Sequence, residues 1–240
     1  AAKPGPAAAP ADATAVKPAA ALSPTEQARK AEEERRRLLT PDDAATRAKD
    51  DATYAQRLTI AQDVIKIGGH GNLGDAKDVV EELVKMPLEA LQLLKDRKTK
   101  VVVCKDSVTD YKTELKGVQP RGWKAGSTWD TVPGLNDIGK NEVVIALRGE
   151  GTPEGAHVPR TGDGHGAANL VIHEVMHALD LNGLKSGEKA KSETDVFKTA
   201  RDADSKSVGA NTYLSQAGEA GRQETFAEAA ARYYSGDAKL

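Results

Sequence analysis

Two of the chain's five histidines stand four positions apart, with a glutamate directly after the first, in the stretch VIHEVMHALD at residues 171–180. In a helix, residues four apart share one face and lie about 6 Å apart along the axis. His173 and His177 can therefore both reach one zinc ion at ~2 Å. Glu174 is placed to reach a water on that ion without being a ligand. Because chance gives this pattern in about 0.7% of chains of this composition, the stretch predicts a zinc site.

The residues around the motif indicate a buried helix. The apolar neighbours are Ala167, Ala168, Leu170, Val171, Val175, Met176, Ala178 and Leu179. The pair Asn182-Gly183 supplies a C-terminal stop. Asp180 lies in the last turn, where the helix dipole disfavours a carboxylate. We therefore expect Asp180 to have a local partner, either a ligand histidine or a surface lysine.

Zinc needs a third protein ligand, with one position left open for water. Cys104 lies in an apolar strand far upstream, and His165 is too close in sequence to its own helix to wrap round it. The stretch RQETFAEAAARYY at 222–234 is the better source, because Glu224 and Glu228 are one helical turn apart among small alanines. One glutamate can ligate zinc while the other orients a ligand histidine. Spacing alone leaves open which does which.

Two β-branched runs, TKVVVC at 99–104 and NEVVIAL at 141–147, predict buried strands. The second is a candidate edge onto which an extended peptide adds as a further strand. Between them, PRGWKAGSTWDTVPG at 120–134 is rich in turn residues and holds both tryptophans. These tryptophans either fill the core beneath the loop, which we favour, or form the wall of a substrate groove.

Capping signals predict helices before these strands. The segment 23–26, Ser-Pro-Thr-Glu, opens a highly charged helix that is a solvated face or a partner-facing arm. The segment 40–43 opens a longer helix that ends at Gly68-Gly69, with its apolar positions at Tyr54, Leu58, Ala61 and Ile65. A further helix starts near Asp75 and restarts at Pro87; its inward residues are Val79, Val80, Leu83, Leu91 and Leu94.

The stretch GGHGNLGD at 68–75 invites interpretation as a phosphate-binding loop. It lacks the Lys-Ser/Thr ending of such a loop and any predicted strand before it. We therefore expect a plain loop.

Composition divides the chain and excludes some partners. Residues 1–22 contain eleven Ala and four Pro and predict a disordered linker; a helical N-terminal arm follows over 23–72, and one α+β domain over 73–240. A net charge of −2 gives no reason to expect nucleic acid or an anionic membrane as partner, and no apolar run approaches the ~20 residues of a membrane span. Without an initiator Met or a signal-peptide core, the chain is expected to be a processed protein or part of a longer one.

The stretches HEVMHALD and ETFAEAAARYY together resemble the zinc metalloprotease domain of the anthrax lethal factor family, which includes the Pro-Pro endopeptidases. The loop with both tryptophans is also similar to that family, and the likeness spans roughly residues 95–235. The resemblance implies a zincin-like α+β fold: a small mixed sheet, an active-site helix with the HExxH motif and a C-terminal helix that carries a glutamate ligand.

By this resemblance His173, His177 and Glu224 bind Zn²⁺, Glu174 is the general base, Glu228 supports a ligand histidine and Tyr213 supports the oxyanion. The chain would then be a zinc-dependent endopeptidase that hydrolyses protein or peptide substrates by a zinc-activated water. Secretion or delivery as a toxin-like effector is a further expectation. The alternative is a non-catalytic, zinc-containing binding module tethered by the linker. The free Glu174 argues against it, because structural zinc usually has four protein ligands.

Overall fold

The computed structural model describes residues 22–120, 125–152, 155–204, 214 and 216–236. The chain divides into two compact units, residues 1–34 and 35–240. The predicted capping box is confirmed: Ser23 Oγ accepts from the Glu26 amide at 3.3 Å, while Glu26 Oε2 accepts from the Ser23 amide at 2.9 Å. Helix α1 (Pro24–Leu38) begins there and buries none of its residues. The linker predicted over residues 1–22 lies outside the described residues, except for the exposed Leu22.

A mixed sheet of four strands lies at the centre of the larger unit, in the order β1-β2-β4-β3. Its strands are β1 (Ile65–Ile67), β2 (Lys100–Lys105), β3 (Gly134–Asp137) and β4 (Glu142–Leu147). Strand β2 pairs in parallel with β1 and β4, and β3 is antiparallel to β4. The two predicted strands are confirmed as β2 and β4. The expectation that NEVVIAL forms an edge is wrong, because β4 has a neighbour on each side, and β1 and β3 are the two edge strands.

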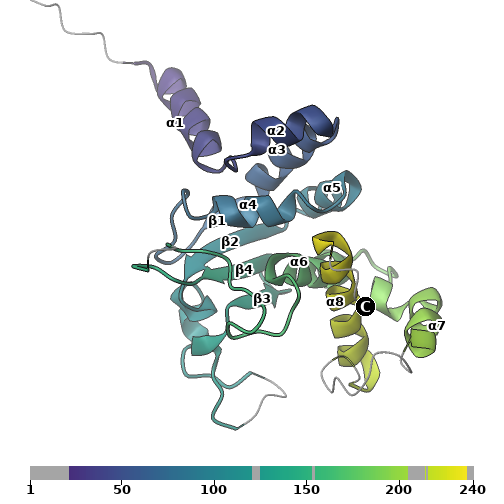
Figure 1. The fold of residues 1–240 in the computed structure, drawn as a ribbon. Coiled ribbons are helices and arrows are strands. Elements are labelled where there is room, and N and C mark those ends of the chain that lie inside the picture. The colour runs from purple at the N-terminus through teal and green to yellow at the C-terminus, as the bar shows by residue number, and fades with distance from the viewer. Residues whose placement is uncertain (1–21, 121–124, 153–154, 205–213, 215, 237–240) are drawn as a thin grey trace, which may run out of the picture. The chain divides into compact units, whose positions relative to one another are not determined.

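The larger unit has its helices gathered mainly on one face of this sheet (Figure 1). The helices are α2 (Ala44–Asp50), α3 (Tyr54–Val64), α4 (Lys77–Leu83), α5 (Leu88–Asp96), α6 (Leu170–Leu181), α7 (Asp195–Asp204) and α8 (Gly218–Ser235), with short 3₁₀ turns η1 (Val108–Asp110), η2 (Thr113–Leu115), η3 (Trp129–Thr131) and η4 (Lys191–Glu193). On β2, Val101 and Val103 face the main core with the helices, whereas Val102 and Cys104 face a smaller core under η1 and η3. The two-residue alternation of the strands thus separates the two faces.

The helices predicted from Asp75 and Pro87 are confirmed as α4 and α5, and their predicted inward residues are all buried. The single long helix predicted from residue 40 to Gly68 is wrong. Asp51 accepts hydrogen bonds from the amide and the hydroxyl of Thr53, both at 2.8 Å, and this local turn separates α2 from α3. Ile65 then takes an extended conformation and pairs with Val101 as part of β1.

The loop at 68–75 does follow a strand, β1, contrary to the sequence-based expectation. It is nevertheless not arranged to bind a phosphate, because a backbone amide of the loop already donates a hydrogen bond to a protein carboxylate. The His70 amide donates to Asp110 Oδ2 at 2.7 Å, and a Cβ at Gly69 would clash with the same side chain. The plain-loop interpretation agrees with this geometry.

The packed core begins earlier than residue 73, where we expected the domain to start. Leu39, Tyr54, Ile60 and Val64 belong to the same apolar core as α4, α5 and α6. Residues 39–67 therefore supply part of the domain's core rather than forming a separate arm. The sequence pattern did not reveal this because β1 forms by pairing with β2, which lies about 35 residues later in the sequence.

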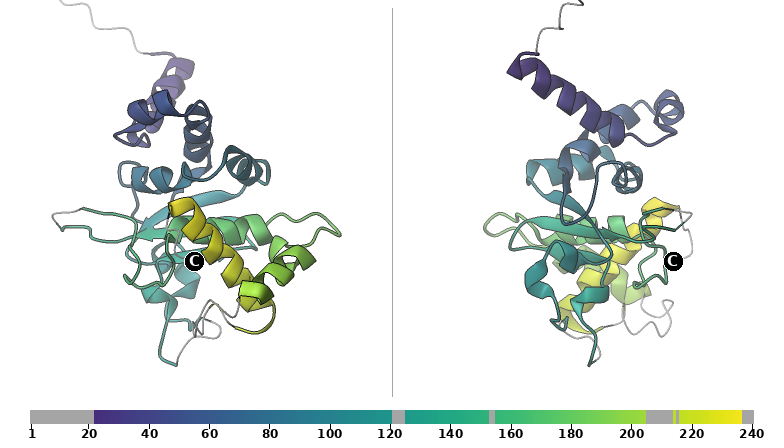
Figure 2. Two further views of the ribbon diagram at one scale, coloured as in Figure 1. Left: turned by 45° about the vertical axis from the view of Figure 1, so that its right-hand side comes forward. Right: turned by 90° about the vertical axis from the view of Figure 1, so that its left-hand side faces the viewer.

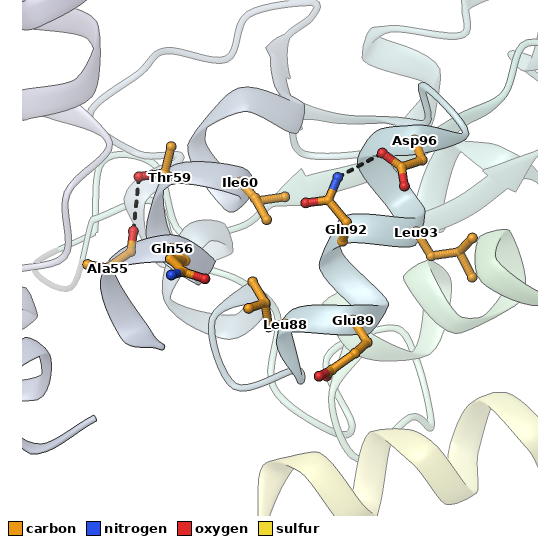
Figure 3. A pocket seen from close by; sticks show the side chains of 9 residues that line it. All are labelled: Ala55, Gln56, Thr59, Ile60, Leu88, Glu89, Gln92, Leu93 and Asp96. Atoms are coloured by element: carbon orange, nitrogen blue, oxygen red, sulfur yellow. Dashed lines mark hydrogen bonds between the residues drawn. The ribbon is translucent and has the colours of Figure 1, made fainter. Parts of the chain in front are cut away.

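A cavity away from the histidines lies between α3 and α5 (Figure 3). Its volume is about 920 Å³, and its lining is Ala55, Gln56, Thr59, Ile60, Leu88, Glu89, Gln92, Leu93 and Asp96. Gln92 donates to Asp96 at 2.7 Å along its rim. Since no histidine or cysteine lines it, this groove does not offer the predicted zinc chemistry.

Among the described residues, no helix is both long enough and apolar enough to span a bilayer.

A buried ion network ties β4 to β1 and β3 at the sheet's end. Glu142 accepts from Lys112 Nζ at 2.7 Å, from Lys66 Nζ at 2.8 Å and from the Tyr111 hydroxyl at 3.0 Å. Lys112 also lies 2.7 Å from Asp137. Burial alone would raise the pKa of Glu142, but the hydrogen bonds from Lys112, Lys66 and Tyr111 outweigh it and lower the pKa from 4.5 to about 2.

We expect Glu142→Gln to lose about 3 kcal/mol of stability at pH 7, because a pKa difference of about two units between folded and unfolded chains is worth roughly that much. A lowered folded pKa stabilises the fold fully above pH 4.5, and that stability is lost as the pH falls towards about 2. Urea unfolding between pH 7 and pH 2 measures both effects. The variant's stability should fall less steeply over this range than that of the wild type. Glu114→Gln, which changes an exposed carboxylate, is the control and should follow the wild type at every pH.

Candidate metal centre

The motif helix forms as the sequence predicts. Asn169 caps α6 by accepting from the Ile172 amide at 3.0 Å, and Gly183 follows the helix with a φ of 63°. Nine of its twelve residues are buried, including His173. The helix therefore holds its two histidines rigidly, beneath α8, which crosses it (Figure 2).

Three ligand atoms from two helices converge on one point. His173 Nε2 lies 3.1 Å from His177 Nε2, and Glu224 Oε2 lies 3.3 Å and 3.4 Å from these two nitrogens. Within the described part of the chain, these are the residues that form a group able to hold a metal. The predicted ligand set is thus brought together by α6 and α8.

The spacing fits a tetrahedral zinc ion. Ligand atoms about 2.0–2.1 Å from zinc at tetrahedral angles stand roughly 3.3 Å from one another, which is the separation found among these three atoms. Glu224 Oε2 is also buried without a hydrogen-bond partner. A buried carboxylate oxygen without a hydrogen bond is costly, and a cation at the common point would satisfy it. Imidazole and carboxylate donors with a fourth position open are the usual ligand set of catalytic zinc.

The pKa shifts of Glu224 and His173 agree with a cation bound between them. Burial disfavours the charged carboxylate of Glu224, but His173 and His177 outweigh it and hold the pKa of Glu224 below its usual range. Burial likewise disfavours charge on His173, while the carboxylates of Glu224 and Glu228 raise its pKa to about 10. Burial raises the pKa of Glu174, as expected for a carboxylate that takes up a proton during a reaction.

Glu228 lies behind the ligand His173. Its Oε2 is 3.4 Å from His173 Nδ1, and both of its oxygens accept from the Ala168 amide at 3.2 Å, just before α6 begins. The positive end of the helix dipole favours a carboxylate there, and Arg232 pairs with it at 2.8 Å. This position suits a residue that orients a ligand rather than one that binds the metal.

Asp180 has the local partner that its unfavourable place on the helix predicts, but the partner is neither a histidine nor a lysine. Its two oxygens accept from the Ser192 amide at 3.0 Å and from the Ser192 hydroxyl at 2.6 Å. Asp180 and Ser192 are both buried. Our prediction of a bond from Asp180 to a ligand histidine is therefore wrong, because two donors of η4 occupy its carboxylate.

The other residues considered as ligands lie elsewhere. Cys104 is buried in β2 on the opposite face of the sheet, where burial raises its pKa to about 12. His165 lines a different cavity, together with the three ligand residues, but its Nε2 bonds to the Pro159 carbonyl at 3.0 Å and it does not belong to the metal group.

A cavity of about 520 Å³ opens over the ligands. Its lining includes Glu174 and many apolar residues: Pro120, Trp129, Val132, Pro133, Leu135, Ile138, Ala167, Leu170, Leu181 and Leu214. Trp129 forms part of this cavity wall and also packs on the smaller core. At Trp129, therefore, the core interpretation and the groove-wall interpretation both apply. Trp123 and Tyr213 lie outside the described residues.

Strand β3 passes close to the predicted base. A Cβ at Gly134 would lie 2.7 Å from Glu174 Oε1 and 2.7 Å from a methyl of Leu170, so only glycine permits this approach. Asn136 on the same strand exchanges amide hydrogen bonds of 2.9 Å and 3.0 Å with Asn182, just after α6. Sequence reasoning missed both features. The Pro133-Gly134 pair, whose glycine begins β3, was visible in the sequence, but nothing local indicates which side chain it approaches.

Gly134→Ala should lower kcat/KM about 100-fold while zinc content stays at the wild-type level. The added methyl displaces the Glu174 carboxylate, and a misplacement of about 1 Å can cost that much. Gly139→Ala is the matched control, because a Cβ there meets only Asp137 at 3.5 Å. Peptide cleavage rates and metal analysis on both variants decide the point: equal activity of the two would mean that the close approach has no catalytic role.

Comparison with known proteins places these features in a family. The family described as "Anthrax toxin lethal factor, N- and C-terminal domain" matches residues 70–239. A Pro-Pro endopeptidase of Clostridioides difficile is 32% identical over 189 residues, covering 77% of each chain. One of Paenibacillus alvei is 31% identical over 77% of this chain and 78% of its own.

A solved structure agrees with the sequence relatives. That of the Pro-Pro endopeptidase from Paenibacillus alvei superposes with a TM-score of 0.56 at 29% identity, covering 73% of this chain and 86% of that one. The predicted zincin-like α+β fold is thereby confirmed, and His173, His177 and Glu224 lie close enough together to serve as the predicted ligand set. Family membership and the open metal position favour the protease over the non-catalytic module. The chain belongs to the anthrax lethal factor-like family and is a zinc metalloendopeptidase.

Proposed function

We propose that this endopeptidase cuts extended, proline-containing peptides, with Glu174 as its general base. The observation that carries the proposal is the position of Glu174, which lines the same cavity as the three ligands and lies against edge strand β3. Its relatives bear the name Pro-Pro endopeptidase. The cavity wall of this chain, with Trp129 and Leu135 among its residues, offers apolar surface suited to proline rings.

Zinc in such a site acts as a Lewis acid and lowers the pKa of a water bound to it towards ~7. Glu174 accepts the proton of the attacking water and passes it to the leaving amine. Glu228 keeps the ring of His173 in place from behind. Tyr213 remains the proposed donor to the oxyanion, and its neighbour Leu214 lines the cavity, which supports that role.

The peptide would lie along β3. This strand pairs only with β4 among the described strands, so its outer edge can accept an added strand. Asn136 and Asn182 hold β3 against the end of α6, which keeps the peptide backbone at a fixed distance from the ligands. The side chains of Leu135 and Ile138, both in the cavity wall, would then contact the substrate.

Matched peptides test this proposal. A proline-rich peptide with a central Pro-Pro pair is compared with peptides carrying Ala-Pro, Pro-Ala and Ala-Ala at that position, and the products are identified by mass spectrometry. We expect cleavage between the two prolines and at least tenfold slower cleavage of the others. Faster cleavage of the Ala-Ala peptide would contradict the proline preference. Glu174→Gln is the control for a contaminating protease, because cleavage that depends on this site should be lost in that variant.

Secretion or delivery into another cell stays a prediction from the family resemblance.

A further inference from the structure

Two metal ligands come from α6 and the third from α8, so the metal site depends on how these helices are placed against each other. Their apolar contact includes Ala227 and Ala231, both fully buried. Alanine allows close approach but presents a smooth surface, and side chains that interdigitate are what fixes one helix against another. Phe226 and Tyr234 of α8 also pack against the main core, and polar contacts add to what sets the register of α8.

One polar tie links the start of α6 to α8. Glu228, four residues after the ligand Glu224, accepts from the Ala168 amide just before α6. This tie belongs to the site already described.

A second tie links the end of α6 to α8 through η4. Asp180, three residues after the ligand His177, accepts two hydrogen bonds from Ser192. The next residue, Glu193, forms a two-point ion pair with Arg222, whose Nε and Nη2 lie 2.7 Å and 2.8 Å from its oxygens. Arg222 stands two residues before Glu224. When a planar guanidinium forms two parallel hydrogen bonds with a carboxylate, both the distance between the two groups and their relative orientation are defined.

The two ties bracket the ligands on both helices. His173 and His177 lie between Ala168, just before α6, and Asp180 in its last turn, and Glu224 lies between Arg222 and Glu228 on α8. With one tie alone, α8 could pivot about it and carry Glu224 Oε2 away from the histidines. With both, the shift and the rotation of α8 are fixed.

We propose that Asp180, Ser192, Glu193 and Arg222 form a clamp that positions Glu224 for metal binding without touching the metal. All four are positioning residues, and the clamp acts on the third ligand rather than on the substrate. The inference goes beyond the peptide specificity proposed above, and zinc affinity tests it independently of any cleavage assay.

Glu193 and Arg222 are the best residues of the clamp to replace, because their side chains are 21% and 23% exposed. Their replacement is therefore less disruptive than that of the fully buried Ser192. Lys198 provides a matched control. It also contacts Glu193, at 3.2 Å, but it lies on α7, which carries none of the three metal ligands.

The test is zinc affinity by competition with a chelator, at one pH, for Arg222→Gln, Glu193→Gln, the double variant and Lys198→Gln. We expect about tenfold weaker binding for either clamp variant, in the range found when groups that support metal ligands are lost. The double variant should be no weaker than the single ones, because the first change already cuts the tie. Lys198→Gln should bind zinc within about twofold of the wild type.

A second readout separates positioning from general stability. The melting temperature of the zinc-free protein shows how much each change weakens the fold, and the visible spectrum of the Co²⁺-substituted protein reports the ligand geometry. Clamp variants that bind zinc within twofold of Lys198→Gln would overturn the proposal, and so would additive losses in the double variant. If Lys198→Gln weakened binding equally, the effect would be one of stability and the clamp would also be refuted.

Discussion

Glu174→Ala should abolish most peptide cleavage while the fold and the zinc content remain those of the wild type. The carboxylate lines the cavity beside the ligands but is not one of them. Removing it takes away the proton acceptor and leaves the metal site intact. General acid–base groups typically contribute about 10²- to 10⁴-fold to a rate, so we expect a fall of this size in kcat, with KM little changed.

The measurement is single-turnover and steady-state cleavage of one peptide, together with zinc analysis of each preparation. Glu219→Ala, which alters an exposed glutamate at the start of α8, should cleave at the wild-type rate. Turnover of Glu174→Ala within a few-fold of the wild type would show that another group accepts the proton. Loss of zinc from this variant would instead mean that Glu174 supports the ligands.

The motif helix could be predicted in detail because its signals are local. A helix fixes the separation of residues four apart, so His173 and His177 had to share a face wherever the helix lay. Its apolar neighbours and its Asn182-Gly183 stop lie within the same stretch. The β-branched runs of β2 and β4 were equally clear, since short buried strands carry their signal in residue type.

Features that depend on distant partners could not be predicted. Strand β1 has only three residues, and its isoleucines continue the helical spacing of α3. Its extended conformation depends on pairing with β2, about 35 residues later in the sequence. The order of the strands has the same origin: nothing within NEVVIAL says whether one or both of its edges are paired.

The site shows the same division between local and distant signals. The family resemblance identified Glu224 as a ligand, and the structure brings it to the histidines. The sequence predicted that Asp180 has a local partner, because the helix dipole disfavours a carboxylate in the last turn. The identity of that partner was not predicted, since Ser192 lies in a short 3₁₀ turn that no periodic pattern announces. Gly134 was visible only as a turn residue until Glu174 was found beside it.

Glu224→Ala and Glu228→Ala should differ sharply in how they hold zinc. Glu224 Oε2 lies within 3.4 Å of both ligand nitrogens, whereas Glu228 approaches only Nδ1, the far side of the His173 ring. Losing Glu224 leaves the metal with two protein ligands. Losing Glu228 removes a group that orients a ligand, which typically costs about 10- to 100-fold in affinity or activity.

A mild chelator should therefore strip zinc from Glu224→Ala far more readily than from Glu228→Ala, and Glu224→Gln should not restore tight binding, because the amide brings no charge. Both variants must be compared at one pH, since protons compete with the metal for the histidines. If Glu228→Ala were the variant that purified without zinc, the two roles would have to be exchanged. If both kept a full equivalent, the third ligand would be another residue, and His165, which already lines the cavity, would be the next to replace.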